Sequence, residues 1–396
     1  MPPTDDPIAG QEAMPLPVQR ELFDIPDDVA YFNCASVSPE LRAATAAGAA
    51  ALARRARPWR IASADWFGEV EERRSLFARL AGVDPEGVAL VPASSYGLAV
   101  AAANLTARPG QRVLVLDDDY PSNWYTWQRF AARTGAELVA VERRDGRRWG
   151  EAVVEATDER TAVVAVLAVH WTDGGAVDLA AIGDRAREAG AALVVDASQG
   201  LGATPLDLAA VRPDYLVSVG YKWLLGPYAL SYLYVAKPHR DGLPLEENWI
   251  NRLGSEDFAA LTAYQDRYQP GARRFDVGQR AHFETTAMAV AALRQLLDWE
   301  VPRIAATLGR VTGRIQGEVE ALGLPLTSSD RVPHMLGIGL PDNARARVAG
   351  ALADAGVFAG VRGSSLRVSP HLWTTDQDIE RLVGALTTAT SGMVAS

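Results

Sequence analysis

Two residues near the middle of the chain, an aspartate and a lysine, have types and positions suited to chemistry on amines. Asp196 follows the apolar run 191–195, and Lys222 lies just after a second apolar run, 215–219. Such short, β-branched runs are typical of strands buried on both faces, and open α/β sheets bind ligands at the carboxyl ends of their strands. Desolvation lowers the pKa of a lysine and frees its amine as a nucleophile, while a buried aspartate needs a partner such as a protonated ring nitrogen.

Taken one at a time, the two could be an ordinary strand-end aspartate and a solvated loop lysine. Together they suit pyridoxal phosphate (PLP), because the aspartate would hold the pyridinium proton and the lysine would bind the aldehyde. The lysine follows 26 residues later, in the order strand-Asp-x-x-Gln and then strand-Gly-Tyr-Lys-Trp-x-x-Gly-Pro. This order resembles the class V aminotransferase family of fold-type I PLP enzymes, which includes cysteine desulfurases, kynureninases and isopenicillin-N-epimerase-like proteins. The resemblance runs from about Tyr31 to the C-terminal helix and implies that Lys222 and Asp196 are catalytic.

The resemblance also implies further cofactor contacts. Ser94 and Ser95 stand where a strand gives way to a helix, and the free N–H groups and dipole of a helix start favour phosphate. An N-cap serine explains the same residues, so it is the family match that implies phosphate binding. Tyr120 falls where the family places a catalytic ring stacked on the cofactor, a core tyrosine being the alternative. Gln199 matches the glutamine at the phenolic oxygen of PLP, and Tyr221 adjoins the lysine.

At several positions the chain departs from the family pattern. Val219 stands where the desulfurases carry a phosphate-binding serine, three residues before the lysine. Gln279 replaces a threonine that reaches the partner subunit's phosphate. We expect Gln279, helped by Arg274, to complete the phosphate site in trans; the alternative is a surface turn. His170 and Trp171 are expected to line the cofactor and substrate pocket, although the asparagine that the family often carries near Trp171 is missing. A lone histidine at a strand end is as often structural.

The substrate side of the site depends on an arginine in the expected strand 365–369. Arg367 matches the family's arginine for the substrate carboxylate, and a guanidinium holds a carboxylate at two points. An exposed strand arginine is the alternative. Asn33 and Ser36 lie in a short turn that the family uses as a substrate-side loop, or that merely caps the next helix. Arg362 is a second cation and could bind an acidic group on the substrate.

The resemblance indicates the opening chemistry better than its outcome. Cysteine desulfurases use a loop cysteine before the carboxylate arginine, and residues 356–364 contain none. Cys34, the only cysteine, is expected to be a small buried residue. We therefore expect a PLP-dependent lyase that acts through an external aldimine and an α-carbanion, by carbon–sulfur β-elimination or related side-chain chemistry of the kind seen in bacterial secondary metabolism. An amino-acid epimerase or aminotransferase is the alternative. A non-catalytic PLP-fold protein is remote, because Lys222, Asp196 and Arg367 are all present.

Composition excludes several other classes of function. The net charge of −10 and pI near 5.1 would repel nucleic acid and anionic membranes. One cysteine and five histidines without ligand spacing predict no metal site. No apolar run reaches the roughly 18 residues of a membrane span. The acidic, proline-rich start does not resemble a signal peptide, so a cytoplasmic location is expected.

Periodicity and the family resemblance together predict an α/β fold of fold-type I. We expect a large domain with a mostly parallel seven-stranded sheet between helices, and a smaller C-terminal α+β domain. The predicted division is a flexible arm over 1–25, the PLP-binding domain over 26–300 and the small domain over 301–396. Residues 238–280 lack a clear period and are rich in Trp, Tyr and Arg. In the family this region crosses to a second subunit, which implies a homodimer with active sites at the subunit interface.

Overall fold

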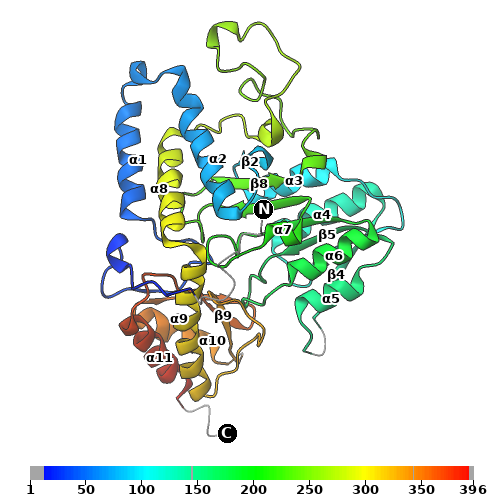
Figure 1. The fold of residues 1–396 in the computed structure, drawn as a ribbon. Helices are drawn as coiled ribbons and strands as arrows, with labels where there is room; N and C mark the ends of the chain where they lie inside the picture. The colour runs from blue at the N-terminus through cyan, green and yellow to red at the C-terminus, as the bar shows by residue number, and fades with distance from the viewer. Residues whose placement is uncertain (1–12, 144–145, 342, 392–396) are drawn as a thin grey trace, which may run out of the picture.

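The central element of the protein is a seven-stranded sheet with the order β2-β8-β7-β6-β5-β3-β4 (Figure 1). The structure, a computed structural model, describes residues 13–143, 146–341 and 343–391. The pairs that involve β8 are antiparallel and the other pairs are parallel, which confirms the predicted fold class. The strands are β2 (Val88–Val91), β3 (Arg112–Leu116), β4 (Glu137–Val141), β5 (Thr161–Leu167), β6 (Ala192–Asp196), β7 (Tyr215–Val219) and β8 (Ser231–Val235).

Helices cover both faces of this sheet because successive strand residues point to opposite sides. One face packs against α3 (Ser94–Asn104) and α4 (Pro121–Thr134). The other packs against α2 (Gly68–Ala81), α5 (Trp149–Ala156) and α6 (Leu179–Ala189), and the short α7 (Leu208–Val211) lies beside α6. Helices α1 (Arg42–Arg55) and α8 (Phe283–Trp299) pack together beside α2 (Figure 1).

A second hydrophobic core lies in the C-terminal part of the chain. It contains a three-stranded sheet of β9 (Leu336–Gly339), β12 (Ser365–Val368) and β11 (Gly360–Arg362). The helices α9 (Val301–Ala321), α10 (Arg345–Asp354) and α11 (Asp376–Thr390) surround this sheet. Helix α8 ends just before Glu300, whose φ of 63° breaks the helical path, and Pro302 lies in the first turn of α9.

The N-terminal segment joins this second core. Strand β1 (Ala30–Tyr31) pairs in parallel with β10 (Val357–Phe358), and Phe32 is buried among the C-terminal elements. Of the arm predicted over 1–25, residues 1–12 lie outside the described residues. Residues 13–25 pack on their own chain, with Phe23 buried edge-on against Trp373. The division into domains at about residue 300 stays a prediction.

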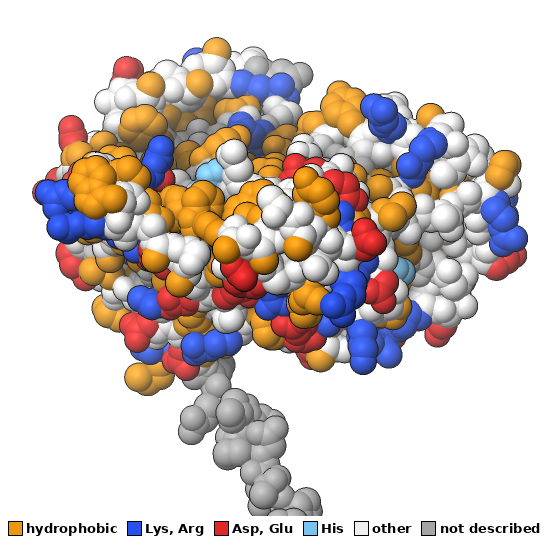
Figure 2. Space-filling model, turned by 90° about the horizontal axis from the view of Figure 1, so that it is seen from above, with side chains coloured by type: hydrophobic (Ala, Val, Ile, Leu, Met, Phe, Trp, Pro, Cys, Tyr) orange, Lys and Arg blue, Asp and Glu red, His pale blue; other side chains and the backbone are white. Residues whose placement is uncertain are grey.

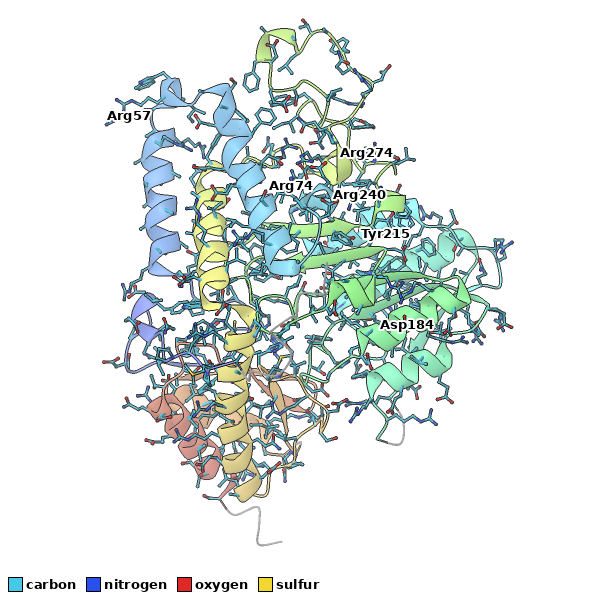
Figure 3. The ribbon with its side chains drawn as sticks, in the orientation of Figure 1. Arg57, Arg74, Asp184, Tyr215, Arg240 and Arg274 are labelled. Carbon is cyan, nitrogen blue, oxygen red and sulfur yellow. The ribbon has the colours of Figure 1, made fainter. Side chains whose placement is uncertain are left out.

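The irregular segment after β8 projects from the large sheet at the top of Figure 1. The buried carboxylate of Asp276 holds the end of this segment in place. It forms ion pairs with Arg74 at 2.7 Å and with Arg280 at 2.6 Å. It also accepts a hydrogen bond from Leu90 N at 2.7 Å. Arg240 and Arg274 belong to this segment, and Figure 3 labels them together with Arg74 of α2. These hydrogen bonds to the backbone of β2 and to two guanidinium groups hold the end of the segment in place, and the 3-10 helix η7 (Gly271–Phe275) just before it packs against β2.

No helix of the described residues is long and apolar enough to cross a membrane. The same residues contain no group of three or more His, Cys, Asp or Glu side chains that could hold a metal ion.

Candidate active site

A polar cavity lies at the carboxyl ends of the parallel strands, with ≈ 330 Å³ of empty space when its opening to solvent is included. Strands β5, β6 and β7 each deliver a residue to it, as expected for an open α/β sheet. The side chains around it come from five separate segments of the sequence. They are Ser94, Tyr120, Leu167, Val169, Trp171, Asp196, Ser198, Gln199, Val219, Tyr221 and Lys222.

The turn after β7 places Lys222 in this cavity. Gly220 N donates to Leu230 O at 2.8 Å, and a Cβ at Gly220 would lie 2.5 Å from the same oxygen, so only glycine fits this close approach. The Lys222 side chain is 7% exposed, and its Nζ lies 5.3 Å from the centre of the Tyr120 ring. Burial, helped by the charge of Arg367, lowers the pKa of Lys222 to about 8, although the charge of Asp196 opposes this shift. About a tenth of the amine is therefore uncharged at pH 7, and about half at pH 8.

Asp196, the last residue of β6, is 4% exposed. Its Oδ1 accepts a hydrogen bond from Ser198 N at 2.9 Å, and the hydroxyl of Ser198 also bonds to the carboxylate. Burial raises the pKa of Asp196, while both Ser198 hydrogen bonds and the charge of Lys222 oppose this shift. A cationic N–H donor in the cavity would relieve the burial of this charge. Sequence reasoning missed Ser198, although its place between Asp196 and Gln199 was a signal.

Gln199 is fixed by three hydrogen bonds to distant parts of the chain. Its Oε1 accepts from Trp223 Nε1 at 2.8 Å, its Nε2 donates to Ala35 O at 2.9 Å, and its backbone oxygen accepts from His334 Nε2 at 2.6 Å. Burial lowers the pKa of His334 to about 4, so this ring is neutral at physiological pH. One N–H of the Gln199 amide remains for a ligand in the cavity.

Tyr120 and Trp171 form an aromatic wall of the cavity. Their rings meet edge to face, with centres 5.5 Å apart at 80°. Asp118 has a φ of 51°, and its backbone oxygen accepts from Trp171 Nε1 at 2.8 Å. The Asp119 carboxylate accepts hydrogen bonds from Tyr120 N at 2.6 Å and from Asn123 Nδ2 at 2.9 Å. The strained turn and its hydrogen bonds fix the Tyr120 ring beside Lys222.

Helix α3 begins next to the cavity, with backbone N–H groups that make no helical hydrogen bond. The first helical hydrogen bonds run from Tyr96 N and Gly97 N to Ala93 O, which leaves the N–H groups of Ser94 and Ser95 at the free helix end. Ser94 is buried and lines the cavity, whereas the Ser95 side chain is exposed and does not. The two predicted phosphate ligands thus differ: Ser94 presents its hydroxyl, and Ser95 only its backbone.

Arg367 lies on β12 and contacts the backbone of Trp171, a residue of the cavity wall, although Arg367 does not itself line the cavity. It is 1% exposed, and its Nη1 donates to Trp171 O at 2.7 Å. Burial and then the charge of Arg362 lower the pKa of Arg367 to about 10, so it remains a cation. Asn33 bridges to Ser369 just beyond β12, and Ser36 N donates to Asn33 O, which keeps this loop beside Arg367.

Several predicted residues do not line the cavity; besides Ser95 and Arg367 they include His170, Gln279 and Arg274. His170 stacks on Trp149 with ring centres 4.8 Å apart, and its two ring nitrogens face Thr172 Oγ1 at 2.9 Å and Asp117 O at 3.1 Å. Both ring nitrogens of His170 therefore have hydrogen-bond partners within the chain, as in a structural histidine. Gln279 is exposed, and Arg274 pairs with Asp241 at 3.0 Å.

The cavity suits PLP in four respects. Lys222 offers an amine, Asp196 a buried carboxylate, Tyr120 an aromatic face, and α3 a free helix start beside Ser94. Val219 does line the cavity where a serine would stand in the desulfurases. Ser218 Oγ is directed to Val219 O at 3.5 Å instead, so it does not replace that serine.

Comparison with known proteins places the chain in a family. The model of the aminotransferase class-V family matches residues 54–382. The uncharacterized aminotransferase YcbU of Bacillus subtilis (strain 168) is 28% identical over 323 residues, which are 81% of this chain and 84% of YcbU. Isopenicillin N epimerase of Streptomyces clavuligerus is 26% identical over 343 residues, 80% of this chain and 83% of the epimerase.

Solved structures share the fold at lower sequence identity. The cystine C-S lyase C-DES, in complex with cysteine persulfide, superposes with a TM-score of 0.82 at 19% identity, covering 91% of this chain and 97% of the lyase. The family match confirms the predicted family and, with it, the predicted cofactor. The chain belongs to the aminotransferase class-V family of PLP-dependent enzymes.

Proposed function

We propose that this protein is a PLP-dependent lyase that acts on an amino acid by carbon–sulfur β-elimination or related side-chain chemistry. The observation that carries the proposal is the pairing of a buried amine, Lys222, with a buried carboxylate, Asp196, in one cavity closed by Tyr120. The relation to a cystine C-S lyase in fold supports elimination as the outcome.

The residues of the cavity have distinct roles in this proposal. PLP would supply an aldehyde for amines and a ring that withdraws electrons from the α-carbon. Lys222 would hold the cofactor, and its uncharged Nζ would take the α-proton of the substrate. Asp196 would keep a proton on the ring nitrogen, and Gln199 would donate to the phenolic oxygen. Arg367 would bind the α-carboxylate through two guanidinium N–H groups.

Desulfuration through a protein persulfide is not supported by the position of the cysteine. Cys34 is the only cysteine of the chain and is fully buried. Burial holds the pKa of its thiol well above the usual range, so the reactive thiolate is disfavoured. A lyase that releases the sulfur product into solution does not require such a cysteine.

Epimerisation is the second candidate, because isopenicillin N epimerase matches over most of both chains. Transamination is the third, because YcbU is described as an aminotransferase. All three reactions begin with removal of the α-proton by Lys222, so the cavity serves each of them. A protein of this fold without catalysis would not need Lys222, Asp196 and Arg367 together.

One experiment separates these outcomes. The PLP-loaded protein is mixed with S-substituted cysteines and other amino acids in deuterated water, and pyruvate, thiol and α-deuterium are followed together. Equal amounts of pyruvate and thiol establish the lyase. Deuteration without pyruvate favours epimerisation, and a keto acid other than pyruvate with loss of the cofactor aldehyde favours transamination. If no amino acid gives any of these products, the proposal is refuted.

We further propose a homodimer in which Gln279 of one subunit completes the phosphate site of the other. Gln279 is exposed on its own subunit, in line with a role across an interface. Several large apolar side chains are also exposed, and the view in Figure 2 shows hydrophobic groups between charged ones. Light scattering tests the dimer, and a lower PLP affinity in Gln279→Ala, with the dimer intact, tests the contact. A small C-terminal domain over 301–396 and a cytoplasmic location complete the proposal.

A further inference from the structure

The hairpin that carries Arg367 presents a second arginine to the same side. Strand β11 pairs antiparallel with β12, with Gly360 opposite Arg367 and Arg362 opposite Ser365. Side chains two positions apart on a strand share a face, so Arg362 and Arg367 emerge from the same face of the hairpin.

The absence of a side chain at Gly360 lets the guanidinium of Arg362 fold back toward the site. A Cβ at Gly360 would lie 3.3 Å from Arg362 Nη1 and 3.2 Å from Asn33 Oδ1. The guanidinium and the Asn33 amide therefore border the space above Gly360, directly across the hairpin from Arg367. Asn33 Oδ1 is buried and makes no hydrogen bond within the described chain. A buried acceptor of this kind is costly unless a ligand satisfies it.

Arg362 has no anionic partner in the part of the chain that the structure describes. Its only hydrogen bond runs from Nη1 to the backbone oxygen of Val361 at 2.8 Å. The charge of Arg362 lowers the pKa of both Arg367 and Lys222, so it acts on the interior of the site and not only on bulk water. An α-carboxylate on Arg367 would still leave the charge of Arg362 unpaired.

We infer that Arg362 forms a second anion subsite, so that the preferred substrates are amino acids whose side chain ends in a carboxylate. This inference rests on the proposed function and names its substrate class. Arg367 binds the α-carboxylate, and Arg362 binds the distal one with its free N–H groups. The Asn33 carbonyl then faces donor groups on the substrate side chain or its ammonium group.

Two ligands of matched shape and different charge test the subsite. S-carboxymethyl-L-cysteine carries the distal carboxylate, and S-carbamoylmethyl-L-cysteine carries a neutral amide in its place. Both are mixed with the PLP-loaded protein, and their affinity is taken from the initial change in cofactor absorbance, before elimination proceeds, with calorimetry recording the heat. We expect the acid to bind about tenfold more tightly or better, the usual strength of a charge-assisted hydrogen bond.

The variant Arg362→Gln removes the charge and keeps a hydrogen-bonding side chain. We expect it to abolish the preference for the acid while the affinity for the amide stays the same. Arg347→Gln, on the exposed surface of α10, is the matched control for net charge and should leave the preference intact.

The outcomes separate this inference from the proposed function. Equal affinity of the wild-type protein for the two ligands overturns the subsite and leaves the proposed function standing. An equal loss for both ligands in Arg362→Gln also overturns it, because Arg362 would then serve the α-carboxylate. If neither ligand changes the cofactor absorbance or releases heat, the proposed function and the subsite fail together.

Discussion

The amine of Lys222 should titrate far below an ordinary lysine in the cofactor-free protein. Burial lowers its pKa from 10.5 to about 8, a shift of about 2.5 units. At about 1.4 kcal/mol per unit, this shift corresponds to about 3 kcal/mol against the charged form. Near pH 8 about half of the amine would be uncharged, compared with under about 1% for a solvated lysine.

The composition of the chain makes this measurement direct. Lys222 and Lys237 are the only lysines, so a sample labelled with ¹³C at the lysine Cε gives two signals in an NMR titration. Lys237→Arg identifies which signal belongs to Lys222. Arg367→Gln should raise the pKa of Lys222, since the Arg367 charge lowers it, and Asp196→Asn should lower it further. A Lys222 midpoint above about 10, or shifts of the same sign in both variants, would refute the electrostatic reasoning.

The same shift predicts how stability changes with pH. Below pH 8 Lys222 is charged in both the folded and the unfolded chain, and the folded chain carries the cost of burying that charge. Between about pH 8 and 10.5 the folded chain loses this proton while the unfolded chain keeps it, so the free energy of unfolding rises by up to about 3 kcal/mol. Lys222→Met should lack this rise, and Lys237→Met, at an exposed position, should retain it. The free energies of unfolding are measured by urea denaturation at several pH values. The same pH dependence for the wild type and Lys222→Met across this window would contradict the prediction.

Three further predictions concern ligands. Borohydride treatment of the PLP-loaded protein should fix the cofactor on the peptide that contains Lys222 in mass spectrometry; Lys222→Ala should lose this adduct and Lys237→Ala should keep it, and an adduct on Lys237 would sink the assignment. Arg367→Gln should weaken amino-acid binding about tenfold to a hundredfold, with a much smaller effect on PLP affinity; unchanged substrate binding would show that another group holds the carboxylate. Tyr120→Ala should weaken PLP binding about fivefold, because the ring contact is lost, while Tyr120→Phe should bind PLP nearly as the wild type does; equal losses would assign the effect to the hydroxyl instead.

The local pattern of the sequence was sufficient for the large sheet and for the two central residues. Strands β6 and β7 are continuous apolar runs, and their carboxyl ends carry Asp196 and the turn to Lys222, so topology alone brings both to one edge of the sheet. Contacts between distant segments could not be read in this way. His334 holds the backbone of Gln199 across 135 residues of sequence, and β1 pairs with β10 although neither strand exceeds two residues.

The sequence also could not predict the directions in which side chains point at the ends of helices and strands. Ser94 and Ser95 are neighbours, but the helix start turns one hydroxyl into the cavity and the other toward solvent. His170 follows a strand at its carboxyl end, the edge at which ligands are expected. Its ring nevertheless stacks on Trp149 and hydrogen-bonds to Thr172 and to the backbone of Asp117. A residue's place along a strand fixes the edge at which it lies, whereas tertiary packing decides what it faces.

The pairing of β1 with β10 has a mechanical consequence for the site. Residues 33–38 follow directly from β1, and this loop is tied to Ser369 at one end and, through Ser38 N, to Tyr221 O at 3.0 Å at the other. The loop therefore works as a tether between the hairpin of Arg367 and the turn that carries Lys222. If the C-terminal core rotates when a substrate carboxylate binds, β1 moves with it because β1 is paired with β10. The hydrogen bond from Ser38 N to Tyr221 O then passes this motion to the turn that carries Lys222.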